Sequence, residues 1–389
     1  MKNLKYLIIT VFSLFSTLVN AQEEAEDKTS RIGFSGSVDA YFRSNFNAPN
    51  KGEFTQAPAT SFANLPGFSL GMANIVATYE GEKVGFVADL VFGPRGEDAV
   101  FGSPLYAGGI AGSSQIVNQL YAYWNINNAV TLSMGNFNTY LGYEVISPTG
   151  NFNYSTSYMF SYGPFSHTGI KADFALSDKW SFMAAVMNPT DMTEFNLYGT
   201  YTLGAQLAYE TEAGGTYLNF LYGDQDGKLN ADDFPTFGTA SLGSTFQVDL
   251  TMGYNVTEPL FLGFNGTYNT SGAGQFYNGT NIENGTGDGA GFYGAAGYLQ
   301  VTTSDKFAIG ARAEYFKVFN DGLEGVVGLS NGDGSVFAVT LSGNAKIANN
   351  LTLIPEIRLD SMSQDFFLNK DLGNSKSLAS FVLAAVFSF

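Results

Sequence analysis

The chain has 389 residues and a formal net charge of −17, with 35 acidic and 18 basic side chains. This balance argues against a nucleic-acid partner, because phosphates are bound mainly by Lys and Arg. Only 14% of the residues are charged, which is low beside the roughly 25% typical of soluble domains. Cysteine is absent, which excludes disulfides, and the 46 glycines, 35 Phe and 22 Tyr indicate a β protein with many turns and aromatic contacts.

The N-terminal segment has the pattern of a secretory signal peptide. Lys2 and Lys5 precede an apolar run over residues 6–19, and a small residue ends the segment. An uncleaved membrane anchor is the alternative, but the run is shorter than the ~20 residues that a spanning helix needs. We predict a signal peptide at 1–21 and a mature domain at 22–389, whose net charge falls to −19 when the two lysines are removed.

Beyond that segment, apolar and polar residues alternate with a period of two, which is typical of β-strands with two different faces. No stretch approaches the ~18 consecutive apolar residues of a membrane helix. Sixteen such segments can be distinguished. The fifth, residues 130–135, is short. The apolar faces of the other fifteen are marked, in chain order, by Phe34, Ile75, Leu90, Leu120, Ile170, Phe182, Leu207, Phe220, Val248, Phe264, Leu299, Ile309, Val339, Ile357 and Phe387.

Charged residues lie on the face opposite the apolar one, as Lys171 and Asp173 show. Because Arg or Lys facing lipid at mid-bilayer costs ~2–4 kcal/mol, the apolar faces are expected to contact lipid and the charged faces to line a lumen. A soluble sandwich with its apolar faces inside has the same periodicity and is the alternative. The predicted pore-lining residues are Asp39, Arg43, Asp89, Lys171, Asp173, Asp249, Arg312, Glu314, Glu356, Arg358 and Asp360.

The connections between these segments alternate in length. Seven short turns, such as 80–83 and 302–306, alternate with eight long connections, such as 136–166. Short turns on one rim and long loops on the other are typical of outer-membrane barrels. We therefore predict an all-β, antiparallel, up-and-down transmembrane barrel of about sixteen strands, with both termini on the periplasmic side.

The closing segment, FVLAAVFSF, ends on an aromatic residue, Phe389. We expect it to close the barrel, with the aromatic ring at the height of the membrane interface. The ending also resembles the C-terminal signal that the outer-membrane assembly machinery recognises. That machinery and outer-membrane lipid are therefore predicted partners.

The acidic connection YGDQDGKLNADDF, residues 222–234, is a candidate calcium loop. Its oxygen ligands would be Asp224, Asp226, Asn230 and Asp233, near positions 3, 5, 9 and 12 of an EF-hand loop. Tyr222 breaks the first position, and strands flank the loop in place of helices. A solvated extracellular loop without metal is the alternative, and no other cofactor is expected.

One block, residues 118–188, carries a more specific signal. It resembles the OmpL-like β-barrel porin family of Gram-negative outer membranes. The matching pieces are Gln119, Tyr121, Gly135, Gly142-Tyr143-Glu144, Asn153-Tyr154-Ser155, Gly163-Pro164-Phe165, His167-Thr168-Gly169 and Asn188. The resemblance implies a barrel in the outer membrane and says little about its cargo.

Within that block, the long connection 136–166 is expected to fold inward as a constriction, with Glu144 exposed to solutes. The candidate constriction residues are Tyr143, Glu144, Asn153 and Tyr154. Near the barrel closure, Arg43, Arg312 and Arg358 are expected to form a basic cluster facing carboxylates. Such a cluster creates a transverse field that favours small polar solutes, or it forms a salt-bridged network that only fills the interior.

His167 is the only histidine. As a catalytic base it would need a nucleophile such as Ser155 or Ser157. No Gly-x-Ser-x-Gly motif accompanies them, and a single histidine excludes a His-based metal site. We predict a structural histidine that is hydrogen-bonded where the loop meets the barrel.

Together these observations predict an outer-membrane porin that passes small hydrophilic solutes passively and is not an enzyme. The alternative is a barrel that anchors a surface enzyme or an adhesion protein and has an occluded lumen. A homotrimer is expected by analogy alone. The acidic charge either favours cations in the pore or lies in solvated loops.

Overall fold

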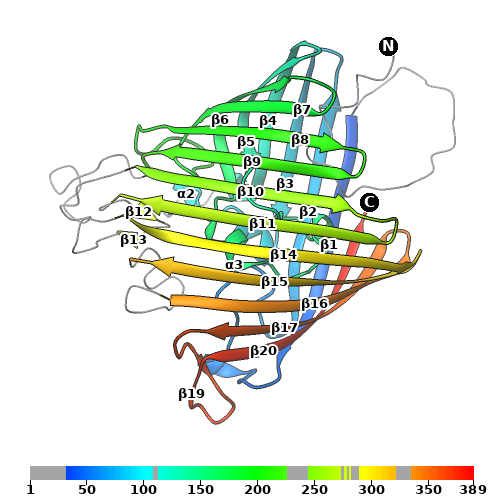
Figure 1. The fold of residues 1–389 in the computed structure, drawn as a ribbon, viewed down its shortest axis with the longest axis vertical. Helices are drawn as coiled ribbons and strands as arrows, with labels where there is room; N and C mark the ends of the chain where they lie inside the picture. The colour runs from blue at the N-terminus through cyan, green and yellow to red at the C-terminus, as the bar shows by residue number, and fades with distance from the viewer. Residues whose placement is uncertain are drawn as a thin grey trace.

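The barrel is closed and antiparallel. The computed structural model describes residues 32–107, 113–225, 244–272, 276–277, 280–281, 289–320 and 334–389. Within them, sixteen strands pair in chain order, and the last pairs with the first (Figure 1). This closed barrel of sixteen antiparallel strands confirms the predicted fold class. Closure leaves no unpaired strand edge in contact with lipid.

The barrel strands have bounds close to the alternating segments of the sequence. They are β1 (Ile32–Asn45), β2 (Gly67–Glu80), β3 (Val84–Phe92), β4 (Val117–Asn127), β5 (Val130–Asn138), β6 (Ser166–Ala175), β7 (Trp180–Met187), β8 (Thr202–Thr211), β9 (Gly214–Gly223), β10 (Thr245–Asn255), β11 (Leu260–Ser271), β14 (Ala290–Ser304), β15 (Phe307–Phe319), β16 (Gly334–Ala348), β17 (Leu351–Met362) and β20 (Ser377–Ser388).

Shorter elements lie in the long connections. They are η3 (Gly52–Phe54), α1 (Pro94–Ala99), α2 (Pro104–Ala107), η4 (Ser113–Ile116), η5 (Pro148–Gly150), α3 (Tyr158–Tyr162), β12 (Phe276–Tyr277), β13 (Thr280–Asn281), β18 (Phe367–Leu368) and β19 (Asn374–Ser375). In the described part of the chain, every helix is too short or too polar to cross a membrane.

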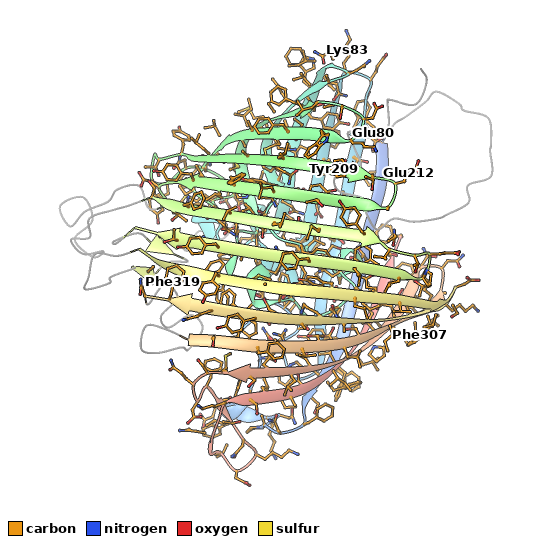
Figure 2. All side chains as sticks on the ribbon, in the orientation of Figure 1. Glu80, Lys83, Tyr209, Glu212, Phe307 and Phe319 are labelled. Carbon is orange, nitrogen blue, oxygen red and sulfur yellow. The ribbon has the colours of Figure 1, made fainter. Side chains whose placement is uncertain are left out.

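The two faces of the wall differ as the alternation predicts. Phe34 and Ile357 are 69% and 51% exposed on the outside, whereas Arg312 and Asp360 are fully buried inside. The apolar faces therefore point outward, which rules out the soluble sandwich. Figure 2 shows Phe307 and Phe319 at opposite ends of β15, where aromatic residues of membrane barrels meet the two interfaces.

The last residue completes the closure. The backbone N–H of Phe389 donates to Gly36 O at 3.1 Å, and Gly36 N–H donates to Phe389 O at 3.0 Å. A Cβ on Gly36 would lie 2.8 Å from the Phe389 ring and 2.2 Å from the carbonyl oxygen of Asn74. A glycine is therefore required on β1 opposite the terminal aromatic residue.

Candidate functional site

Parts of three long connections fold into the barrel lumen: residues 46–66, 93–107 and 139–165, the last of which we call the inserted segment. Figure 1 draws α3 of the inserted segment behind β14, and the hydrogen bonds described below place it inside the barrel. Side chains of all three connections, with two strand residues, form one buried apolar cluster: Phe62, Met72, Val91, Ala99, Val100, Ile146, Phe160 and Phe165. The lumen thus contains a small core of its own.

Two wall carboxylates hold the backbone of the inserted segment. Glu356 on β17 accepts hydrogen bonds from Tyr154 N–H at 2.8 Å and Ser155 N–H at 3.3 Å. Glu314 on β15 accepts from Tyr158 N–H at 2.9 Å and Met159 N–H at 2.8 Å. Buried carboxylates need such partners, and the segment supplies them from otherwise unpaired backbone groups.

Two buried ion pairs lie beside these contacts. Arg312 on β15 pairs with Glu144 of the inserted segment, and Arg358 pairs with Asp360 on the same strand at 2.8 Å. Both guanidinium groups also donate to backbone carbonyls of the inserted segment, at 2.7–2.8 Å. Removing one partner of a buried pair typically costs ~3–5 kcal/mol, so these contacts fix the segment firmly.

Side-chain hydrogen bonds extend this attachment. Tyr154 donates its hydroxyl proton to Asp39 on β1, and Tyr158 donates to Asp360 at 3.0 Å. Asn153 donates to Ser342 on β16 at 2.7 Å. The inward faces of β15, β16, β17 and β1 are therefore bound to the inserted segment, and we call them the anchored wall.

The other side of the inserted segment faces β8, β9, β10 and β11. Asp249 on β10 accepts three neutral donors: Gly142 N–H at 3.0 Å, Asn219 at 2.9 Å and Asn265 at 2.6 Å. Tyr140 donates its hydroxyl proton to the carbonyl of Phe220 at 2.7 Å. We call this face the amide wall, after its buried inward-facing amides Gln206, Asn219, Gln247, Asn265 and Asn269.

Arg95 at the start of α1 joins the three connections. It is buried, and its Nε and Nη1 donate to the carbonyls of Ile146 at 2.7 Å and Tyr154 at 3.2 Å. Its guanidinium lies 4.3 Å from the ring centroid of Phe62, close enough for a cation–π interaction. Sequence reasoning missed Arg95, because a charge in a Gly- and Pro-containing loop ordinarily indicates a solvated turn.

All eleven predicted pore-lining residues face the interior. Nine are at least 95% buried; Lys171 and Asp173 keep 24% and 30% of their side chains exposed and form an ion pair at 2.9 Å. Asp89 accepts from Asn118 at 2.7 Å and Asn74 at 3.2 Å.

Two finer expectations need correction. Glu144 is not exposed to solutes, because its pairing with Arg312 leaves its side chain 3% exposed. Among the described residues, Arg43 forms no ion pair with a carboxylate; it donates to Gln56 O at 2.9 Å and Asn45 Oδ1 at 2.8 Å. Around Arg312 and Arg358, the charged side chains therefore form a network that fills the interior. This was the alternative to a basic cluster that faces solutes.

His167 has the predicted structural role. It is fully buried, and its Nε2 lies 2.9 Å from Oγ1 of Thr139, the first residue of the inserted segment. Ser157 caps α3 by accepting from Phe160 N–H at 3.1 Å, and Ser155 Oγ accepts from Arg358 at 3.4 Å. None of the hydrogen bonds found among the described residues joins His167 to either serine.

The structure describes only one of the four predicted calcium ligands. Asp224 accepts from Ser244 at 3.4 Å, whereas Asp226, Asn230 and Asp233 lie outside the described residues. Elsewhere in the described ranges, no group of three or more His, Cys, Asp or Glu side chains could hold a metal ion.

Asp191, between β7 and β8, ties that connection to the end of the inserted segment. Its carboxylate accepts from Phe165 N–H at 2.7 Å and Ser166 N–H at 2.9 Å. Burial raises the pKa of Asp191 to about 6, and the two backbone donors only partly oppose this increase. The Asp191 carboxyl therefore changes its charge near pH 6.

A protein-family model matches nearly the whole chain. The model described as "Putative beta-barrel porin-2, OmpL-like" matches residues 31–389. The chain belongs to this porin family. The match extends the resemblance seen at 118–188 to nearly the whole chain, and it places the protein in the outer membrane. No curated protein matches the chain by sequence.

Solved structures of outer-membrane barrels share the fold of this porin-family chain. OmpT of Vibrio cholerae lacking loop L8 has a TM-score of 0.57 at 12% identity, covering 92% of this chain and 99% of its own. The DcaP channel of Acinetobacter baumannii has 0.55 at 12%, with 92% and 97% covered. An anion-selective porin from Comamonas acidovorans has 0.55 at 10%, with 92% and 99% covered. At these identities the likeness concerns the fold alone, which is that of a porin-like outer-membrane channel.

Proposed function

We propose that small hydrophilic solutes diffuse passively through this barrel. The supporting observation is a lumen lined by ionised and amide side chains inside an apolar, lipid-facing wall. At Lys171 and Asp173, side chains on that inner face keep water contact. The inserted segment narrows the lumen, so only small solutes are expected to pass.

A specific observation favours a second candidate, a barrel whose lumen stays occluded and which serves as an anchor. Three connections share one buried cluster inside the barrel. If this cluster never opens, the exposed rim would carry the function. We rank it second, because the inserted segment makes only a few polar contacts with the amide wall and can separate from it there.

Liposome swelling distinguishes the two candidates. Folded protein is reconstituted into vesicles and mixed with isosmotic sugars of increasing mass, from pentoses to trisaccharides. Diffusion predicts fast swelling with pentoses and progressively slower swelling with larger sugars. Swelling no faster than in protein-free vesicles, even with pentoses, would favour the anchor.

Further features of the mature protein belong to the same proposal. We infer removal of the signal peptide 1–21, recognition of the C-terminal strand by the assembly machinery, and assembly as a homotrimer; one solved OmpT structure of Vibrio cholerae is described as a trimer form. We propose that transport needs no cofactor and no chemical reaction. Native mass measurement in detergent tests the trimer, and calcium titration followed by melting tests the loop at Asp224.

A further inference from the structure

We infer that solutes pass between the inserted segment and the amide wall, and that this passage favours neutral polyhydroxylated solutes and cations over anions. The inference rests on the proposed channel function and adds a route and a solute class. Its basis is the unequal attachment of the inserted segment to the two walls.

The anchored wall offers no open route. Its carboxylates Glu314 and Glu356 are occupied by backbone N–H groups of the inserted segment, and Arg312 is paired with Glu144. These side chains are 95% or more buried, as are Asn219 and Asp249 on the amide wall, so the two walls differ in the number and charge of their contacts and not in burial. A solute on this side would have to replace several charge-assisted contacts at once, each of which is strong in a buried environment.

The amide wall makes fewer contacts with the inserted segment, and the wall groups involved are uncharged apart from one carboxylate. The main ones are the bond from Gly142 N–H to Asp249 and that from Tyr140 to a wall carbonyl. Glycines on this wall, rather than side chains, receive the tyrosine rings: a Cβ on Gly204 would lie 2.4 Å from the Tyr140 hydroxyl oxygen, and one on Gly263 2.7 Å from that of Tyr143. Separation here breaks few polar contacts.

A recess already lies along this boundary. The inserted segment lines it through Leu141, Gly142 and Pro164, and the wall lines it through Gln247, Asp249 and Thr267. Two buried polar atoms near this boundary, the Tyr143 hydroxyl and Asn269 Oδ1, have no hydrogen-bond partner in the described part of the chain. Such groups are stabilised by a ligand or water that supplies the missing hydrogen bond.

The chemistry of the wall selects the solute class. Amides and hydroxyls both donate and accept, so they can replace the hydration of sugar hydroxyls one for one. The inward-facing acidic or basic side chains on β8–β11, which the structure describes throughout, are Glu210 and Asp249, and both are acidic. Anions are therefore repelled, whereas cations and neutral solutes are not.

Because the chain has no native cysteine, introduced thiols can map the route. Thr267 on the amide wall and Val336 on the anchored wall are matched positions: the register links Thr267 to Gly294, Gly294 to Phe316, and Phe316 to Val336. Both side chains are buried and inward-facing. The variants Thr267→Cys and Val336→Cys are reconstituted in planar bilayers, after heat-modifiable gel mobility has verified folding.

A cationic methanethiosulfonate reagent is expected to reduce the current of Thr267→Cys at least twofold, and an anionic reagent to react more slowly. Val336→Cys is expected to keep its current. Block at Val336→Cys without block at Thr267→Cys, or equal block at both, would overturn the route while leaving the channel function intact. Absence of current in the parent protein would overturn the channel function and the route with it.

The charge preference is tested separately at Asp249. Asp249→Asn keeps the shape of the side chain, and it is expected to lower the cation-to-anion permeability ratio from reversal potentials at least twofold. An unchanged ratio, or an anion preference in the parent protein, would overturn the proposed solute class.

Discussion

Glu144 of the inserted segment and Arg312 of β15 are 168 residues apart in sequence and form an ion pair inside the barrel. Their side chains are 3% and 0% exposed. The pair joins the inserted segment to the inner face of the barrel wall, and other side chains surround it in the lumen. The position of the inserted segment therefore depends on a contact between residues that are distant in the sequence.

Breaking this pair is expected to loosen the inserted segment. Glu144→Ala leaves the guanidinium of Arg312 buried without its carboxylate partner, which costs ~3–5 kcal/mol. We expect a lower thermal midpoint and more frequent channel openings. Replacing both residues, as in Glu144→Ala with Arg312→Met, should restore part of the loss. Strictly additive effects in this double-mutant cycle would show that the two residues do not interact.

The outward face predicts a depth-dependent penalty for charge. Leu341, in the middle of β16, is 47% exposed, and Ile347, near the short-turn end of the same strand, is 58% exposed. Leu341→Arg should destabilise the barrel by ~2–4 kcal/mol and Ile347→Arg by about 0–1 kcal/mol, because only the former faces the bilayer interior. Reversible unfolding by denaturant in lipid vesicles measures both. Equal penalties would contradict the assignment of this face to lipid.

Gly135 on β5 should resist substitution. Its φ is +137°, and a Cβ there would lie 2.2 Å from the carbonyl oxygen of Leu120 on the neighbouring strand. Gly135→Ala is therefore expected to cost about 2 kcal/mol or more in unfolding free energy and to lower the yield of folded barrel. Gly297→Ala is the control, because nothing lies within 4 Å of its added Cβ. A stable Gly135→Ala barrel would mean that the strands are paired differently.

The barrel could be predicted from sequence because its determinants are local. Alternation such as Asp39 and Arg43 against Phe34 and Phe42 specifies the two faces, and turn lengths specify the two rims. The arrangement inside the lumen could not be predicted in the same way. Glu314 meets Tyr158 across 156 residues, and no periodicity marks such a partner.

The same limit explains which site residues were missed. Arg95 lies in a loop, and only the folded chain brings it against Ile146 and Phe62. The amide wall had a readable signal, since Gln206 and Gln247 occupy inward positions of alternating strands. Amide side chains contact polar solutes as well as charged ones do, so inward-facing amides are as informative as inward-facing charges.

Asp191 should make stability depend on pH. Its usual pKa is 3.8, and burial raises it to about 6 in the folded protein. The folded state therefore holds this proton more tightly, so the contribution is complete below pH 3.8 and is lost as pH rises through 6. Between pH 3.5 and pH 7.5, the stability of wild type relative to Asp191→Asn should fall by about 3 kcal/mol. A difference that stays constant across this range would show that Asp191 does not titrate in that way.

Single-channel recording in planar bilayers tests the central claim most directly. Purified, folded protein should insert with discrete conductance steps, and the current should fall when small neutral sugars are added. Its cation-to-anion permeability ratio should be higher than that of Asp249→Asn. Insertion of folded barrels, verified by heat-modifiable mobility, without any conductance step would contradict the assignment of this chain as a channel for hydrophilic solutes.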